Sequence, residues 1–238
     1  MFNLLKIENF KLRRFIPFYV SLAFFLALEI YGMIDGGLSQ NYFNYFHNMH
    51  DGFAEGVQDC SLSFLYGMLI AWFVGIDFSQ RTVHRALVTG NKRLNVVISK
   101  LIASTIITTV FHICLIISDL IIFGRAYGFS LEGFCSRDLL WFGVILLQFI
   151  AYNSFFVLVT FVCGNVYSAT IISVIVASVG GNILRNFLGG NFIYEHSFFC
   201  FAKSSQNSDL IPCALCAIMF IVIFVTATVA VFKKKDVN

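Results

Sequence analysis

The chain has 238 residues, of which 58% are hydrophobic and 12% are charged, and its formal net charge is +3. A soluble domain carries about a quarter of charged residues. A protein of this size cannot hide so much apolar surface from water in its own core. The composition therefore excludes an ordinary soluble domain and predicts an all-α integral membrane protein. It does not suggest a nucleic-acid partner.

Six apolar runs have the length of about 17–25 residues that a helix needs to cross the hydrocarbon core of a bilayer. In chain order they cover 15–34, 60–76, 101–123, 139–162, 168–184 and 210–232. The first has the basic flank of a signal peptide. However, it is long, contains Glu29 and lacks a small-x-small cleavage site, so we expect a retained span. The sequence thus predicts six transmembrane helices in a single transmembrane domain over residues 1–238.

Basic residues are distributed unevenly between the two sides that six spans create. Residues 1–14, residues 77–100 and the tail lysines together place twelve Lys and Arg on one side, against four on the other. Since basic loops stay in the cytoplasm, the pattern predicts a multi-pass protein with both termini cytoplasmic.

Two outer segments differ in character. Residues 35–59 are expected to form an acidic loop, because they contain no Lys or Arg but four acidic residues, Asp35, Asp51, Glu55 and Asp59. Residues 185–209 are rich in aromatic residues, which favour the headgroup layer, and contain Gly189 and Gly190. We expect them to form a re-entrant outer hairpin between the fifth and sixth helices, covered by protein.

The basic segment 77–100 connects the second and third runs and holds five of the sixteen Lys and Arg residues. We expect a helix over 77–89, with Asp77 as its N-terminal cap and Gly90 at its end. Helical periodicity places Asp77, Arg81, His84 and Arg85 on one face and Val83, Ala86 and Leu87 on the other. Two interpretations are open: the basic face meets an acidic partner protein, or the segment binds anionic lipid headgroups and sets the topology.

Two short motifs resemble those of ABC-2 type transporter permeases. Lys6-x-Glu8-x-x-Lys11-Leu12-Arg13-Arg14 is similar to the family's entry into the first span. The second motif comprises Asp77-Phe78, Arg81-Thr82-Val83, Leu87, Gly90 with Lys92-Arg93, and Ser99-Lys100. The predicted six spans and the outer hairpin also agree with this family.

The resemblance implies the permease subunit of an ATP-binding cassette exporter in the bacterial cell (cytoplasmic) membrane. It implies that residues 77–90 form a cytoplasmic coupling helix that docks on a separate ATPase through Asp77, Arg81, Val83, His84, Arg85 and Leu87. Two copies of that ATPase would carry ATP and Mg²⁺, and a second permease, as a homodimer or heterodimer partner, would complete the transporter. Similar permeases move antimicrobial peptides, lipids or other amphipathic compounds outward.

This chain has no G-x-x-x-x-G-K-[ST] motif, so we expect no cofactor on it. It has no G-x-S-x-G and no H-E-x-x-H motif either, so we expect no catalytic residue. The expected partners are the ATPase, the second permease and membrane lipids. A metal site is not expected, because His47-x-x-His50-Asp51 on an undefined loop is weak evidence for one. Disulfides among Cys60, Cys135 and Cys200 are left open.

The fifth run carries small residues at every fourth position, namely Ala169, Ser173, Ala177 and Gly181. Such a stripe lets helix backbones approach closely. It is interpreted either as a dimer or gate contact or as packing within one subunit.

Glu29 and Asp119 are acidic residues within predicted spans, and counting about 1.5 Å per residue places both in the outer part of the bilayer. They are candidate substrate or gate residues, or they reach the outer headgroups. The alternative function follows from them: an ATPase-independent carrier, or a small-molecule-binding membrane subunit, that uses Glu29 and Asp119 together with His112.

Overall fold

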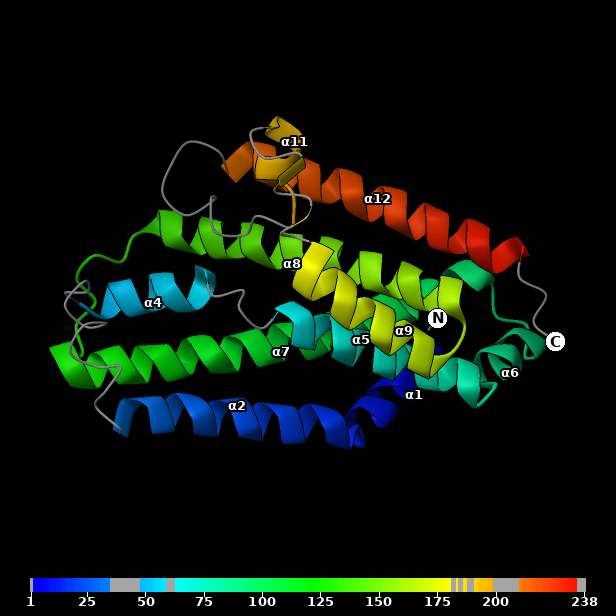
Figure 1. Cartoon of the computed structure of the whole chain (residues 1–238), viewed down its shortest axis with the longest axis horizontal. Coiled ribbons are helices and arrows are strands. Elements are labelled where there is room, and N and C mark those ends of the chain that lie inside the picture. The colour runs from blue at the N-terminus through cyan, green and yellow to red at the C-terminus, as the bar shows by residue number, and fades with distance from the viewer. Residues whose placement is uncertain are drawn as a thin grey trace.

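The computed structural model describes residues 2–34, 48–58, 63–180, 183, 186–187, 191–198 and 210–234, and these fold into helices joined by turns (Figure 1). The helices that build the bundle are α1 (Phe2–Arg13), α2 (Ile16–Ile34), α4 (Met49–Gln58), α5 (Ser63–Ser79), α6 (Thr82–Val88), α7 (Arg93–Tyr127), α8 (Ser136–Cys163), α9 (Val166–Ile175) and α12 (Leu210–Lys234). The predicted all-α class agrees with this architecture.

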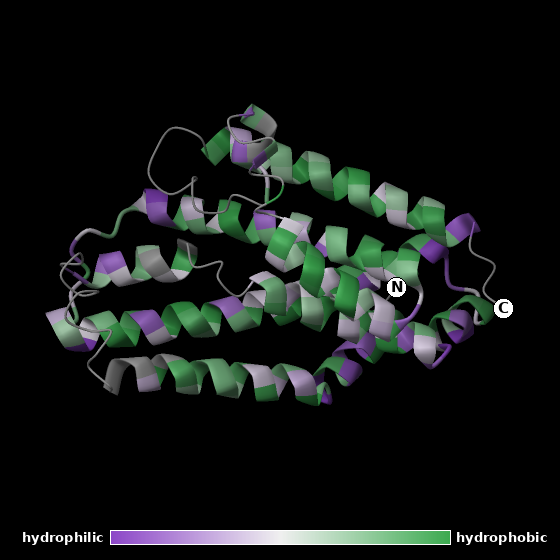
Figure 2. Cartoon of the chain, viewed as in Figure 1, coloured by the Kyte–Doolittle hydropathy of each residue, from purple (hydrophilic) through white to green (hydrophobic). Residues whose placement is uncertain are grey.

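Three of these helices, α7, α8 and α12, are long and apolar enough to cross a membrane. They lie side by side, and apolar residues cover most of their length (Figure 2). Three shorter apolar helices cover Ile16–Leu28, Ser63–Ser79 and Val166–Gly180. All six coincide with predicted spans. The three long helices indicate a membrane protein, and a crossing by the three shorter ones stays a prediction.

Helix α7 is longer than the predicted span 101–123 at both ends. Its 35 residues measure about 50 Å at about 1.5 Å per residue, whereas the hydrocarbon layer is about 30 Å thick. The helix therefore extends past the layer that its apolar centre could cross. Its first two turns carry residues 93–100, which belong to the basic segment expected to connect the second and third spans.

The core between α5, α7 and α8 combines aromatic rings with interhelical polar contacts. The Tyr66 ring on α5 packs edge-on against Phe111 of α7 and Phe149 of α8, with centroids 5.6 and 5.4 Å apart. Asn153 on α8 donates to Thr108 Oγ1 on α7 over 2.8 Å. Such bonds satisfy polar groups that would otherwise be costly inside a membrane bundle.

Helix α4 lies where the sequence predicts an outer loop. It packs chiefly on α7, between α7 and α8 in Figure 1. Its glycines permit this approach, because a Cβ atom on Gly52 would collide with the Phe123 ring and one on Gly56 would lie 2.6 Å from Asp119 Oδ2. A Gly-x-x-x-Gly spacing is a known signal of close helix contact. The signal is easily missed in the sequence, because here it lies outside the long apolar runs.

Helices α8 and α9 are antiparallel neighbours joined by Gly164 and Asn165. Gly164 adopts the left-handed conformation that ends α8, with φ 64°. The Asn165 side chain accepts a hydrogen bond from the Tyr167 N–H over 2.9 Å to start α9. A connection this short forces the chain to reverse at once. Helix α9 then continues into a π-helical turn, η1 (Val176–Gly180).

The small-residue stripe of α9 lies partly inside the chain. Ala169 and Ser173 are fully buried, and α9 packs chiefly on α5. Ala177 is half-buried against the core, and Gly181 lies outside the described residues. The first two stripe residues therefore pack within this subunit.

Most of the predicted hairpin 185–209 lies outside the described residues. The described part contains α11 (Phe192–Glu195) and Phe198. The Phe198 ring is buried and lies 6.0 Å from Phe155 of α8 and 5.3 Å from Phe220 of α12, between centroids. This contact fixes the segment to α8 and α12. Cys60 and Cys200 are outside the described residues, and Cys135 is an exposed free thiol.

Candidate functional site

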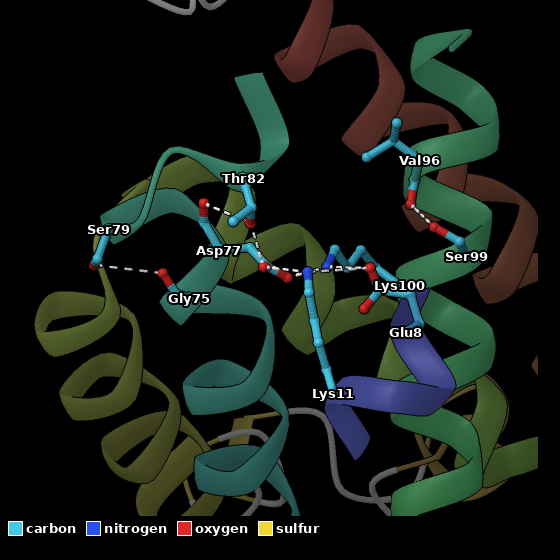
Figure 3. Close-up of polar contacts among 9 residues, drawn as sticks. All are labelled: Glu8, Lys11, Gly75, Asp77, Ser79, Thr82, Val96, Ser99 and Lys100. Atoms are coloured by element: carbon cyan, nitrogen blue, oxygen red, sulfur yellow. Dashed lines mark hydrogen bonds and ion pairs between the residues drawn. The ribbon is translucent and has the colours of Figure 1, made fainter. Parts of the chain in front are cut away.

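The two sequence motifs, which lie far apart along the chain, meet at one end of the bundle. Glu8 and Lys11 lie on α1, Asp77 on the last turn of α5 and Lys100 near the start of α7 (Figure 3). Up to 92 sequence positions separate the partners. We call these four residues the ionic cluster.

Asp77 is the centre of the ionic cluster. Lys11 Nζ donates to Asp77 Oδ1 over 2.6 Å, and Lys100 Nζ donates to Asp77 Oδ2. Lys100 also donates to Glu8 Oε1 over 2.7 Å, and Lys11 Nζ lies 3.5 Å from the same oxygen. Thr82, the first residue of α6, donates its hydroxyl to Asp77 Oδ1. One carboxylate thus joins α1, α5, α6 and α7.

Three of the four residues of the ionic cluster are buried, Lys11 is half-buried, and the formal charges balance. Asp77 is 1% exposed, Lys100 3% and Glu8 4%. Charges at such burial are unfavourable unless they are paired, which explains why two acids and two lysines occur together. Burial disfavours the Lys11 ammonium, but the carboxylates of Asp77 and Glu8 outweigh it and raise the pKa of Lys11 above its ordinary value. Lys11 is therefore charged at neutral pH.

The expected helix over 77–89 is wrong in its first part. Asp77 does not cap it: Asp77 belongs to α5, and α6 covers only Thr82–Val88. The reason is that two lysines from other helices form ion pairs with the Asp77 carboxylate. Arg81 precedes α6 with φ 54°, a left-handed conformation that is uncommon for a residue with a side chain. The predicted end is correct, because Gly90 has φ 85° and its N–H donates to Leu87 O over 2.9 Å.

Helix α6 separates its basic and apolar side chains. Arg81 and Arg85 are exposed and His84 is half-buried, whereas Val83 is buried and Leu87 packs against the core. The predicted faces therefore hold for these five residues. The error concerns Asp77, which is separated from the basic face and lies in the ionic cluster.

A cavity of about 240 Å³ lies beneath α6, between α1 and the start of α7. Val83, Arg85 and Ala86 of α6 line one side, and Glu8 and Lys100 line another. Helix α6 is therefore not packed tightly against α1 and α7. It is held at its start by the Thr82–Asp77 bond and by the buried Val83 side chain.

The end of α12 lies at the same end of the bundle as α1 and α6 (Figure 1). The Arg93 guanidinium donates to the carbonyl of Phe232 and lies 5.3 Å from the centroid of its ring. This contact brings the last turn of α12 to the start of α7. The exposed basic residues of this region, which we call the basic end, are Lys6, Arg13, Arg14, Arg81, Arg85, Lys92, Lys233 and Lys234.

The other candidate residues lie away from the ionic cluster. Glu29 is part of α2, but its side chain is outside the described part of the structure. Asp119 is half-buried on α7 beside Gly56 of α4. His47 is not described, whereas His50 Nε2 lies 3.3 Å from Asp138 Oδ2. Within the described ranges, no three His, Cys, Asp or Glu side chains gather as metal ligands would.

Sequence reasoning finds a role for Asp77 but none for its partners. Glu8, Lys11 and Lys100 are recognised only as parts of motifs, and Lys100 counts as a basic residue of the cytoplasmic connection. The available signal is the placement of opposite charges at the edges of apolar runs, where a charged side chain needs a partner. Comparison of the chain with protein-family models, curated proteins and solved structures gave no match.

Proposed function

We propose that this chain is the permease subunit of an ABC-2 type exporter that crosses the bacterial cytoplasmic membrane six times. In this arrangement α1, α6 and the end of α12 face the cytoplasm. The single observation that carries the proposal is the bond between Thr82 and Asp77. Because Asp77 also binds Lys11 and Lys100, a displacement of α6 is transmitted to α5, α1 and α7 at one point.

The exposed face of α6 has the chemistry of a docking surface for an acidic partner. Arg81 and Arg85 are exposed within one turn of each other, and like charges so close are favoured when an opposite charge meets them. The buried Val83 fixes the opposite face of α6 to the bundle. A partner bound to the arginines therefore also acts on the bundle through Val83.

The energy must come from another chain under this proposal, since the sequence has no P-loop. Two ATPase subunits would bind ATP and Mg²⁺ and close against each other, and a second permease would complete the path. The outward face of α9 offers an apolar surface for that second copy, with Tyr167, Ile171 and Ile175 all more than half exposed. The cargo is an amphipathic peptide or lipid-like compound that moves outward.

The experiment compares charge reversal at α6 with charge reversal at the opposite end of the bundle. The tagged protein is purified from its native membranes, and the co-purified P-loop ATPase is identified and assayed for ATP hydrolysis in proteoliposomes. The test variant is R81E/R85E. The matched control is R125E/R137E, which reverses two exposed arginines at the other end of α7 and at the start of α8.

We expect the test variant to lose at least about tenfold in bound ATPase, which corresponds to about 1.4 kcal/mol, and to lose stimulated hydrolysis. The control is expected to behave as the wild type. Full hydrolysis in the test variant, or the lack of any P-loop protein with the wild type, contradicts the proposal. The alternative, an ATPase-independent carrier, predicts the reverse: Glu29→Gln abolishes transport and the α6 variant retains it.

A further inference from the structure

A second cavity, of about 370 Å³, lies on the other side of α1, between α1 and α7. Its lining includes Leu5, Lys6, Glu8, Asn9, Ile102 and Ile106. Glu8 is the residue that it shares with the cavity beneath α6. The others play no part in the ionic cluster.

Glu8 lines this cavity and carries a hydrogen-bond acceptor that the described residues leave unsatisfied. Its Oε1 atom accepts from Lys100, but its Oε2 atom is buried and has no hydrogen-bond partner among the described residues. Buried carboxylate oxygens in folded proteins are almost always paired. Because an ionised carboxylate can only accept hydrogen bonds, a partner of Glu8 Oε2 must be an N–H or O–H donor.

The exposed part of the cavity lining includes a positive charge, opposite in sign to the Glu8 carboxylate. Lys6 and Asn9 are exposed and line the cavity. An ammonium and an amide at a membrane surface are suited to a phosphate group. A ligand that fits both positions therefore has a phosphate and, a short distance away, a hydrogen-bond donor.

The third side of the cavity leads onto an apolar face. Ile106 lines it and is 44% exposed, and further exposed apolar residues follow at helical spacing along α7. These are Val110, Ile113, Ile117 and Ile121. A continuous face of this kind on a membrane helix contacts hydrocarbon. An acyl chain can thus run from the cavity along α7.

We propose that this cavity binds an aminophospholipid, of which phosphatidylethanolamine is the simplest. Its primary ammonium donates to Glu8 Oε2, its phosphate lies beside Lys6, and an acyl chain follows the Ile106 face of α7. Phosphatidylcholine fits the phosphate and the chain but has no N–H to donate. Inorganic phosphate satisfies neither Glu8 nor the apolar face. The proposal requires a membrane protein and is independent of ATP-driven transport.

The test is native mass spectrometry of the delipidated full-length protein, titrated with phosphatidylethanolamine, phosphatidylcholine or phosphatidylglycerol. We expect phosphatidylethanolamine to bind about tenfold or more tightly than phosphatidylcholine, the usual effect of one hydrogen bond to a charged group. E8Q should remove this preference, whereas K6Q should weaken all three lipids. Neither lipid preference nor its loss depends on the presence of an ATPase.

Two further variants test the cavity without changing Glu8, so that the proposal does not depend on the folding of E8Q. I106W fills the apolar side of the cavity without touching the ionic cluster and should lower the binding of all lipids. I113W adds the same bulk to the same face of α7 two turns further on and should bind as the wild type. The proposal is overturned if phosphatidylethanolamine and phosphatidylcholine bind equally, or if phosphatidylglycerol binds most strongly. It is also overturned if the preference survives E8Q, or if I106W and I113W behave identically.

Discussion

Asp77 is the residue that contacts most partners in and around the ionic cluster. It accepts from a lysine on α1, a lysine on α7 and a hydroxyl on α6, so it satisfies three donors with two oxygens. A hydrophobic replacement of the entire ionic cluster could be tolerated. The loss of one partner is different, because it leaves another charge buried and unpaired.

Replacement of Lys100 by methionine should therefore destabilise the protein strongly. Glu8 and Asp77 would keep only the half-buried Lys11 as a cationic partner. We expect a loss of about 3–5 kcal/mol, the usual effect of breaking a buried ion pair. The measurement is denaturant unfolding in detergent, followed by tryptophan fluorescence.

The matched control is Lys92→Met, which removes an exposed lysine from the residue just before α7. A surface charge contributes little, so this variant should unfold within about 0.5 kcal/mol of the wild type. Equal unfolding of the Lys100 and Lys92 variants would show that the ionic cluster does not hold the bundle together.

The sequence predicts the positions of the six apolar helices well, because each is a long run of one residue class. It fails at α4, whose composition of His, Asp, Gly and Glu resembles a loop. It also fails at the boundary between α5 and α6. There, the choice of Asp77 between capping α6 and pairing with Lys100 depends on a helix that begins sixteen residues later. Only three-dimensional proximity decides such cases.

Helix α4 should be sensitive to a single added methyl group. Gly56→Ala places a Cβ atom 2.6 Å from Asp119 Oδ2 and 3.2 Å from the backbone of Ile116, so the Asp119 carboxylate must turn aside and the two backbones must separate slightly. Overpacking of this kind costs about 1–3 kcal/mol. Thermal unfolding of the purified protein should show the loss.

Gly143→Ala serves as the comparison within a helix. Gly143 lies in α8, and a Cβ atom added to it would meet no atom within 4 Å among the described residues. Alanine is the better helix former, so this variant should be neutral or up to about 1 kcal/mol more stable. A Gly56→Ala protein as stable as the Gly143→Ala protein would contradict the close packing of α4.

At the scale of the whole molecule, the described residues place most exposed basic residues at one end. Hydrophilic residues surround α1, α6 and the start of α7 in Figure 2, at the end where α12 also finishes. The pattern of Lys and Arg along the chain predicts this grouping without any knowledge of contacts. It does not predict which of those residues are buried, because burial depends on how α1 folds back against α7.

Chemical labelling in intact cells tests the proposed orientation. Cys135 is exposed at the start of α8, and a cysteine introduced at Lys92 would be exposed at the basic end. A membrane-impermeant maleimide should modify Cys135 in intact cells but should modify Lys92→Cys only after lysis, because basic segments stay in the cytoplasm. Peptide mass spectrometry identifies each labelled site, and labelling of both sites in intact cells would refute the topology.

The ionic cluster also has a consequence for synthesis. Glu8, Lys11 and Asp77 leave the ribosome before Lys100, so the nascent chain carries two carboxylates with a single ammonium until the third apolar helix is made. The early helices can associate only loosely during that interval, since an unbalanced charge resists burial. Synthesis of the first turns of α7 supplies the missing ammonium. The position of Lys100 in the sequence therefore determines when, during translation, α1, α5 and α7 can pack tightly together.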